Sequence, residues 1–277
     1  MVTLKKSFST LAKSIFQKLE TCAPKFFLQF LAKVFGKKKS SYSFYGEDLV
    51  IQGLMERINF ETNQEPMLSY IDIGAWQPIR GSNTYKIYRQ GGSGTVVEPN
   101  PHFLKLWRAV RPRDNFLQIA CGNSDFAELH IFHENAASNT LSENFVDYVE
   151  SSQNYSVQRK LTVKCLSLQE IIQMHRTKFD QHFILDLDIE GLDEEVITTY
   201  DFPTGFRPLL ILLEDILLPG QDLTSTLSAR HLENLKYKVV GRTALTTIFI
   251  DLESDLLNEM FSERKMFQEE KNLKIKF

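Results

Sequence analysis

The sequence has few of the residues that build metal centres and disulfide frameworks. Its three cysteines, Cys22, Cys121 and Cys165, are far apart, and no C-x-x-C pair occurs among its 277 residues. A structural zinc site and a disulfide-stapled secreted fold are therefore disfavoured, and a reducing cytoplasm is the expected location. The histidines are scattered along the chain and do not suggest a metal centre either.

Long apolar runs and the common glycine signatures are also missing. No run reaches the roughly 18 apolar residues of a membrane-spanning helix, and no compact apolar region precedes a small-residue cleavage site as in a secretory signal. There is no P-loop, and Gly91-Gly92-Ser93-Gly94 has the wrong spacing for a G-x-S-x-G elbow. These absences argue against P-loop nucleotide hydrolases and nucleophile-elbow hydrolases.

What the sequence does have is an uneven distribution of charge. Residues 1–39 contain nine lysines and one acid, Glu20, whereas the rest of the chain has more acids than bases. Apolar residues recur at helical spacing in this basic segment, interrupted at Pro24. Such a segment is predicted either to lie on an anionic membrane or to pack as a helical cap on the domain or a second subunit. The acidic body argues against nucleic-acid binding.

Strand-like and helix-like segments alternate from residue 68 to residue 251. The apolar runs Phe183–Leu185 and Leu209–Leu213 are typical of strands buried on both faces, as in parallel sheets covered by helices. The last two strands are joined by a short link at Gly241-Arg242, which requires an antiparallel hairpin. Strands are predicted at Leu68–Ile73, Thr95–Glu98, Phe116–Ala120, Phe183–Asp188, Leu209–Glu214, Tyr237–Val240 and Thr246–Asp251. Helices are predicted at Gly46–Ile58, Ser82–Gln90, Pro101–Val110, Leu168–His175, Asp193–Tyr200 and Leu223–Leu235.

The predicted fold is an α/β doubly wound sheet, mostly parallel, with a C-terminal antiparallel hairpin, which is similar to the Rossmann-like class I methyltransferase fold. Two further strands, Ala127–Phe132 and Leu161–Cys165, flank a polar stretch over residues 135–158. That stretch is long for a loop, and long loops in compact domains are often lids or binding elements. Three parts are predicted: a basic helical arm over residues 1–41, a main domain over 42–255 and a charged helix or tail over 256–277.

Acidic residues follow several predicted strands, at the edge where open α/β sheets bind ligands. Glu98 follows Asp72 at about the spacing of an acid that accepts hydrogen bonds from ribose hydroxyls; the alternative is that it belongs to the start of the next helix. Asp188 and Glu190 end the central strand, and Asp186 is predicted to share the face of Asp188. These three acids could orient a substrate hydroxyl, act as a general base, bind a divalent ion or cap the following helix.

The turn after the first strand reads YIDIGAWQP and has one glycine, Gly74, where a dinucleotide site would have three. Those three glycines serve a pyrophosphate that packs against the turn. A cofactor without phosphate, such as S-adenosylmethionine, makes no such demand, so Asp72 and Gly74 are enough. The missing glycines therefore favour S-adenosylmethionine over a dinucleotide as the ligand.

Six segments, in order, make the sequence similar to the FkbM family of S-adenosylmethionine-dependent methyltransferases. Each is weak evidence alone, but their order and spacing are specific, and together they extend from about Tyr42 to Asp251. The segments are SFYGEDLVI (Ser43–Ile51), YIDIGAWQP with SNTYKIYRQGG (Tyr70–Gly92), VVEPNPHFLKLW (Val96–Trp107), IACGNSD (Ile119–Asp125), LDLDIEGLDEEVI (Leu185–Ile197) and RPLLILLEDI (Arg207–Ile216).

The resemblance implies methyl transfer to a hydroxyl, commonly on sugars or polyketide-like metabolites. By matching position, Asp72 and Gly74 belong to the turn at the methionine side of the cofactor. Glu98 matches the ribose acid and Asn123 the adenine end. The predicted cofactor-binding residues are Asp72, Gly74, Ala75, Asn83, Glu98, Pro99 and Asn123.

Asp188 and Glu190 match the D-x-E-G acids that the family has near the transferred methyl group. The chain departs from the family in two places. Trp76 and Pro78 stand where the commoner turn, D-x-G-A-N-x-G, has asparagine and glycine. Asp186 stands where many members have lysine.

We therefore expect an S-adenosylmethionine-dependent O-methyltransferase with Asp188 as the base and Glu190 or Asp186 orienting it. A divalent metal is not indicated, but Asp188 and Glu190 would be its ligands. Trp76 and Pro78 either reshape the methionine end of the site or help to form the acceptor pocket with Asn83.

Two other functions remain as alternatives. One is an NAD-type oxidoreductase, which the missing glycines and the terminal hairpin disfavour. The other is a non-catalytic, membrane-associated binding protein that keeps the methyltransferase fold. The expected partners are a small-molecule or glycan acceptor and, through residues 1–39, the inner face of an anionic membrane; no nucleic acid is expected.

Overall fold

The computed structural model describes the main domain of the chain. The described residues from Ser41 onward belong to one compact unit. The predicted basic arm and most of the charged tail lie outside the described residues and stay predictions; liposome flotation with and without residues 1–39 would test the arm. The described residues are 40–62, 69–153, 155–179, 182–200, 202, 206–215 and 226–258.

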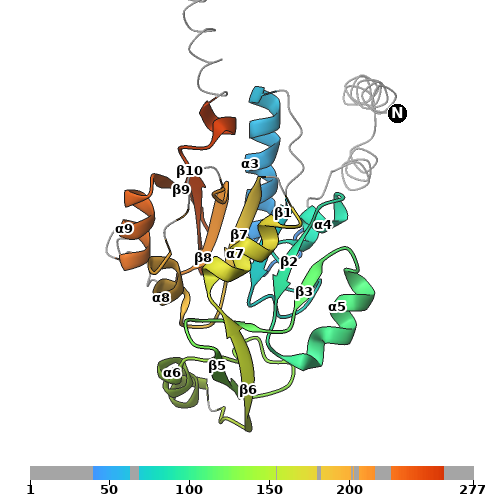
Figure 1. The fold of residues 1–277 in the computed structure, drawn as a ribbon, viewed down its shortest axis with the longest axis vertical. Helices are drawn as coiled ribbons and strands as arrows, with labels where there is room; N and C mark the ends of the chain where they lie inside the picture. Colours follow the sequence, from blue (N-terminus) through green and yellow to red (C-terminus); the bar gives the residue numbers. More distant parts are fainter. Residues whose placement is uncertain are drawn as a thin grey trace, which may run out of the picture. The chain divides into compact units, whose positions relative to one another are not determined.

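The described residues form a seven-stranded main sheet in the order β3-β2-β1-β7-β8-β10-β9 (Figure 1). Strands β3, β2, β1, β7 and β8 are parallel, and β10 runs antiparallel to both β8 and β9. The predicted doubly wound sheet with a C-terminal antiparallel hairpin is therefore confirmed. The strands are β1 (Ser69–Ile73), β2 (Ser93–Val97), β3 (Asn115–Leu117), β7 (Phe183–Leu187), β8 (Leu210–Glu214), β9 (Tyr237–Arg242) and β10 (Thr246–Asp251).

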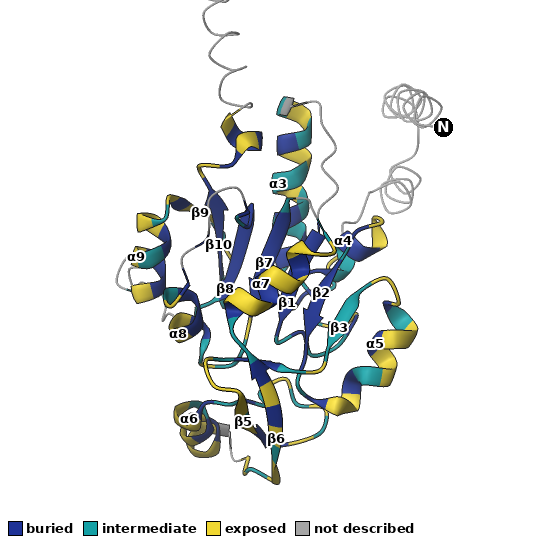
Figure 2. Ribbon diagram, viewed as in Figure 1, coloured by how far each residue is buried: buried dark blue, intermediate teal, exposed yellow. Residues whose placement is uncertain are grey.

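Helices cover both faces of this sheet, because successive residues of each strand point to opposite sides. Ile71 of β1 packs in the core that α7, α8 and α9 cover, and Tyr70 packs in the core that α3, α4 and α5 cover. The central strands are accordingly buried, while the outer faces of the helices are exposed (Figure 2); the buried strands are β1, β2, β7, β8 and β10. The helices are α3 (Glu47–Thr62), α4 (Tyr85–Arg89), a 3-10 turn η1 (Pro101–Phe103) continuing into α5 (Leu104–Val110), α7 (Leu168–Arg176), α8 (Asp193–Thr198) and α9 (Leu227–Asn234).

A second, three-stranded sheet lies beyond one end of the main sheet, in the order β4-β6-β5 (Figure 1). It contains β4 (Ala120–Cys121), β5 (Phe126–Ile131) and β6 (Arg159–Leu166). The prediction of a continuous loop over residues 135–158 is wrong in part, since this stretch contains α6 (Glu143–Gln153). Val146 and Val149 bury one side of α6 against Phe132.

None of the helices in the part of the chain that the structure describes has the length and apolar character that crossing a bilayer requires.

Candidate active site

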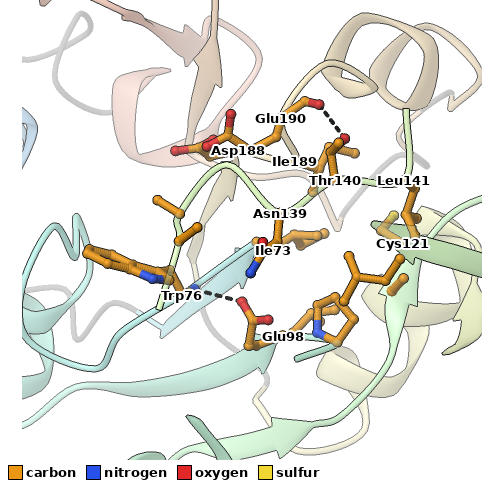
Figure 3. A pocket seen from close by; sticks show the side chains of 17 residues that line it. Ile73, Trp76, Glu98, Cys121, Asn139, Thr140, Leu141, Asp188, Ile189 and Glu190 are labelled. Atoms are coloured by element: carbon orange, nitrogen blue, oxygen red, sulfur yellow. Dashed lines mark hydrogen bonds between the residues drawn. The ribbon is translucent and has the colours of Figure 1, made fainter. Parts of the chain in front are cut away.

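A cleft with an empty volume of about 540 Å³ lies at the carboxyl ends of β1, β2 and β7, and we call it the central cleft (Figure 3). No basic side chain is among the described residues that line it. The lining residues are Ile73, Gly74, Trp76, Val97, Glu98, Pro99, Ala120, Cys121, Leu129, Ala136, Ala137, Asn139, Thr140, Leu141, Asp188, Ile189 and Glu190.

Gly74 lets the backbones that leave β1 and β7 come together at the floor of the cleft. Its φ is +82°, and a Cβ atom added there would lie 1.7 Å from the backbone oxygen of Asp188. The approach is fixed by the Asp188 N–H, which donates to the Ile73 carbonyl at 3.0 Å. The sequence predicts that Gly74 lets the cofactor come close to the backbone. The structure shows that Gly74 is needed in any case for the close contact between the chain leaving β1 and the chain leaving β7.

Trp76 also has left-handed backbone, with a φ of +44°. Its N–H donates to Oε2 of Glu98 at 2.9 Å, and its carbonyl accepts from the indole N–H of Trp107 at 2.9 Å. Its own indole N–H donates to the carbonyl of Asn135 at 3.1 Å. A bulky residue with positive φ is a genuine outlier, and these three hydrogen bonds hold it there.

Glu98 follows β2 and presents its carboxylate to the cleft, with Pro99 beside it. Oε2 accepts from Trp76 N–H, and Oε1 accepts from Asn100 N–H at 2.7 Å. Burial raises the pKa of Glu98 to about 7, against the two backbone hydrogen bonds, which lower it. Because each carboxylate oxygen can accept a second hydrogen bond, both remain able to take a ligand hydroxyl.

Three acids meet at the opposite end. Asp188 and Glu190 line the cleft, and Glu214, the last residue of β8, is a hydrogen-bonding partner of Asp188. Desolvation is the main cause that raises their pKa values, to about 7 for Asp188, about 9 for Glu190 and about 10 for Glu214, and repulsion from neighbouring acids, including Asp193 in all three cases, adds to it. Asp188 as a residue is exposed at the cleft, whereas Glu190 is half-buried.

The turn that carries these acids is shaped by Asp193 at the start of α8. Its carboxylate accepts from the backbone N–H groups of Ile189 at 3.0 Å and Gly191 at 3.2 Å. Within this turn Glu190 has a φ of +53°, and its carbonyl accepts from the hydroxyl of Thr140 at 2.7 Å. No side chain caps the start of α8 at Leu192, so the helix-capping role considered for this segment is not found, and Glu190 lines the cleft.

Asp72 and Asp186 lie behind the cleft, paired in register on β1 and β7. Both are buried; Asp72 accepts from the Thr84 hydroxyl, and Asp186 accepts from the Asn83 amide at 3.1 Å. Burial and the neighbouring Asp72 raise the pKa of Asp186 well above its ordinary value. Asp186 and Asp188 both interact electrostatically with Asp72 and Glu47, in agreement with the expectation that they share a face, but Asp186 is buried and only Asp188 lines the cleft.

The structure therefore brings together part of the predicted site. Ala75 packs in the core under α3 and α4, and Asn123 is exposed beside a separate surface hollow. The predicted residues that line the central cleft are Gly74, Glu98, Pro99, Asp188 and Glu190. Those that do not are Asp72, Ala75, Asn83, Asn123 and Asp186.

A family model described as the methyltransferase FkbM domain matches residues 72–239, which is more than half of the chain. The chain belongs to the FkbM methyltransferase family. No curated protein and no solved structure matches it. Membership of the FkbM family makes the protein a methyltransferase, and the matched region runs from β1 into β9, so it includes the central cleft.

The commoner FkbM turn has asparagine where this protein has Trp76. Asparagine adopts left-handed backbone more readily than most residues with a side chain, so it suits the φ of +44° found here. Tryptophan adopts left-handed backbone less readily than asparagine, but its indole N–H donates a hydrogen bond to the carbonyl of Asn135. The substitution thus adds a link across the cleft of this FkbM methyltransferase.

Several residues of the site carried no sequence signal that singled them out. Asn139, Thr140 and Leu141 enter the cleft because the β5–β6 sheet carries them there, and nothing in their local pattern predicts it. Glu214 did have a signal, since it ends a parallel strand next to β7. Cys121 also lines the cleft, but burial raises the pKa of its thiol to about 12, so it is not a nucleophile.

In the described ranges, no three His, Cys, Asp or Glu side chains are arranged to hold a metal ion. Asp188 and Glu190 as metal ligands therefore stay a prediction.

The raised pKa values of Glu190 and Glu214 predict that the ligand-free FkbM methyltransferase loses stability as pH rises from about 4.3 to about 10. The pKa values of Glu190 and Glu214 are raised on folding, so the folded state holds protons that the unfolded state has released. Their stabilisation is complete below the unfolded pKa of about 4.3 and is lost as pH rises through the folded values. The melting temperature should fall across this range.

Glu214→Gln should flatten that slope, because it removes the most strongly shifted carboxyl. Glu195→Gln, at an exposed position on α8, is the matched control and should keep the wild-type slope. A melting temperature that is constant or rises with pH in the wild-type protein would contradict the prediction.

Proposed function

We propose that this FkbM methyltransferase transfers the methyl group of S-adenosylmethionine to a hydroxyl of a sugar or another small metabolite. The main support is that carboxyl groups line the central cleft: Glu98 and Asp188, with pKa values of about 7, become negatively charged around neutral pH, whereas Glu190 is still protonated there. Glu98, Asp188 and Glu190 line it, and no described basic residue does. A cationic sulfonium is attracted to such a lining, whereas the pyrophosphate of NAD would be repelled. The same charges therefore disfavour an NAD-type oxidoreductase.

The two ends of the cleft suit the two ends of the donor. Glu98 would accept hydrogen bonds from the ribose hydroxyls, since each of its oxygens is fixed by one backbone N–H. Asp188 and Glu190, at the opposite end, would lie near the sulfonium. When bound, S-adenosylmethionine supplies an electrophilic methyl group on a cationic sulfur.

Asp188 is the proposed general base. The acceptor O–H loses its proton as its oxygen bonds to the methyl carbon and the methyl–sulfur bond breaks, so a group in the cleft must take that proton. A pKa of about 7 suits Asp188 to this task near neutral pH. Glu190, with a pKa of about 9, keeps its proton at pH 7 and would orient the acceptor oxygen.

The acceptor is proposed to enter from a neighbouring groove, which we call the side groove. It has an empty volume of about 1460 Å³ and shares Ala136, Ala137 and Glu190 with the central cleft. Its aromatic residues come from the end of β5, from α6 and from the segment after α6. Aromatic faces and adjacent polar groups suit a ring-shaped, hydroxyl-bearing acceptor. The aromatic lining residues are Phe132, Phe145, Tyr148 and Tyr155.

Calorimetry at pH 8 with S-adenosylhomocysteine and with NADH tests the donor. The wild-type protein is expected to bind the first and not the second. Glu98→Gln keeps the size of the side chain but loses the charged acceptor, so the affinity for S-adenosylhomocysteine should fall about 10- to 100-fold. Glu128→Gln, at an exposed position on β5, should leave it unchanged. Binding of NADH, or no binding of S-adenosylhomocysteine, would overturn the proposal.

A further inference from the structure

Residues 134–140 cross the mouth of the central cleft, and we call them the strap. Side chains from the turns after β1 and β2 fasten its first end. The Asn100 amide donates to the carbonyl of Glu134 at 3.0 Å, and the Trp76 indole donates to the carbonyl of Asn135 at 3.1 Å. His102 Nε2 lies 2.8 Å from Asn135 Oδ1. The first end of the strap is therefore tied to the wall that holds Glu98.

The other end of the strap is tied to the acid turn. The hydroxyl of Thr140, which is buried, donates to the carbonyl of Glu190 at 2.7 Å (Figure 3). Thr140 also exchanges backbone hydrogen bonds with His130 of β5, at 2.8 and 3.3 Å. The strap thus connects the two ends of the cleft, one at Glu98 and one at Glu190.

Both attachments are made to residues with left-handed backbone. Among the described residues other than glycine, positive φ occurs at Trp76, Glu190 and Lys236. The first two hold the two ends of the strap, and the third lies far from it, just before β9. Strained backbone of this kind persists where the surrounding structure fixes it, and it concentrates at ligand clamps.

The middle of the strap is the wall between the two cavities. Ala136 and Ala137 line both the central cleft and the side groove, while Asn139 lines the cleft alone and Ser138 the groove alone. A shift of the strap therefore changes both cavities at once.

We propose that the strap is a clamp over the bound methyl donor and that Trp76 is the residue that positions it. Trp76 holds Glu98 through its backbone N–H and the strap through its indole N–H. A ligand bound to Glu98 therefore holds Trp76 in place, and Trp76 holds the strap. Because the strap forms the wall between the two cavities, its position also sets the shape of the side groove. Donor binding would in this way prepare the acceptor site. This inference rests on the proposed function, because it takes the ligand of Glu98 to be the donor.

Hydrogen exchange of the full chain, with and without S-adenosylhomocysteine, tests the clamp. In the wild-type protein the ligand should slow exchange of the strap amides about tenfold, because opening of the strap is then coupled to ligand release. In Trp76→Phe the ring remains but the indole donor is gone, so this protection should fall to about threefold or less. Each variant is compared at a concentration of S-adenosylhomocysteine that saturates it, so a lower affinity of Trp76→Phe does not by itself reduce the protection.

Thr140→Val and Thr140→Ser are the matched pair at the other end. Valine lacks the hydroxyl that reaches Glu190 and should lose the ligand-induced protection, whereas serine should keep it. Exchange in β6 serves as an internal reference and should be the same in all variants, which separates the clamp from general loosening. Equal protection of the strap in Trp76→Phe and wild type would overturn the clamp. Failure of the wild-type protein to bind the ligand would instead overturn the proposed function, and the clamp with it.

Discussion

Replacing Gly74 by alanine is expected to remove more than about 4 kcal/mol from the free energy of unfolding, a loss that few single substitutions cause and that marginally stable domains seldom survive. The added Cβ would lie 1.7 Å from the backbone oxygen of Asp188. That oxygen belongs to the chain leaving a fully buried strand, so it has no free direction in which to move. Separating the two backbones would break the pairing of β1 with β7 at the centre of the sheet.

Gly91→Ala is the matched control for Gly74→Ala. Gly91 also has a positive φ, of +106°, but nothing lies within 4 Å of the Cβ position. Its replacement should cost only the backbone strain, about 1–2 kcal/mol. Urea unfolding of both variants measures the difference. Similar losses of unfolding free energy in Gly74→Ala and Gly91→Ala would mean that the segments after β1 and β7 can move apart at little cost, which would contradict the prediction.

Asp188→Asn is expected to lower the rate of methyl transfer by about 10²- to 10⁴-fold, which is the usual contribution of a general base. Asparagine has nearly the same shape, so affinity for S-adenosylhomocysteine should change little. The wild-type rate should rise with pH through about 7, because only the carboxylate form of Asp188 accepts the proton. The variant should lack this rise. Transfer of labelled methyl from S-adenosylmethionine into a pool of hydroxyl-bearing metabolites provides the assay.

The matched control for this loss is Asp147→Asn, at an exposed position on α6. It should keep both the wild-type rate and its pH dependence. A normal rate in Asp188→Asn would show that the proton goes elsewhere. A slow variant that still speeds up through pH 7 would show that the titrating group is not Asp188.

The make-up of the main sheet, parallel strands followed by an antiparallel hairpin, could be predicted because its signals are local. The fully apolar β7 and β8 indicate a doubly covered parallel sheet, and the short link before β10 allows only a hairpin. Helix α4 is shorter than predicted because the Ser82 hydroxyl accepts the N–H of Tyr85, which starts the helix later. Helix α6 was missed because its few apolar residues lie within a strongly polar stretch.

The central cleft could be predicted only where residues end a strand. Gly74, Glu98 and Asp188 do so, and the topology alone brings them to one edge. Asn123 follows a strand as well, but the chain leaves the main sheet after β3 and pairs with β6, which carries this residue away. That departure depends on contacts distant in sequence, and no local pattern encodes it.

The same limit applies inside the strands. Asp72 and Asp186 are predicted from the sequence to contact the cofactor or substrate because each lies one residue before the end of its strand. The alternation of side chains along the strand instead directs them toward the face covered by α3 and α4. A buried pair of acids is costly without partners. The hydroxyl of Thr84, the amide of Asn83 and, through Thr84, the guanidinium of Arg111 provide them.

During synthesis, β8 leaves the ribosome before the strand that covers its edge. Its partner on that side is β10, and β9, which emerges in between, lies outside β10 and pairs with it alone. Until residue 251 has emerged, the apolar edge of Leu210–Leu213 is therefore open on the nascent chain. Open apolar edges pair with other chains, and larger domains are vulnerable while they are incomplete. The last hairpin thus covers the edge of β8 and completes the sheet.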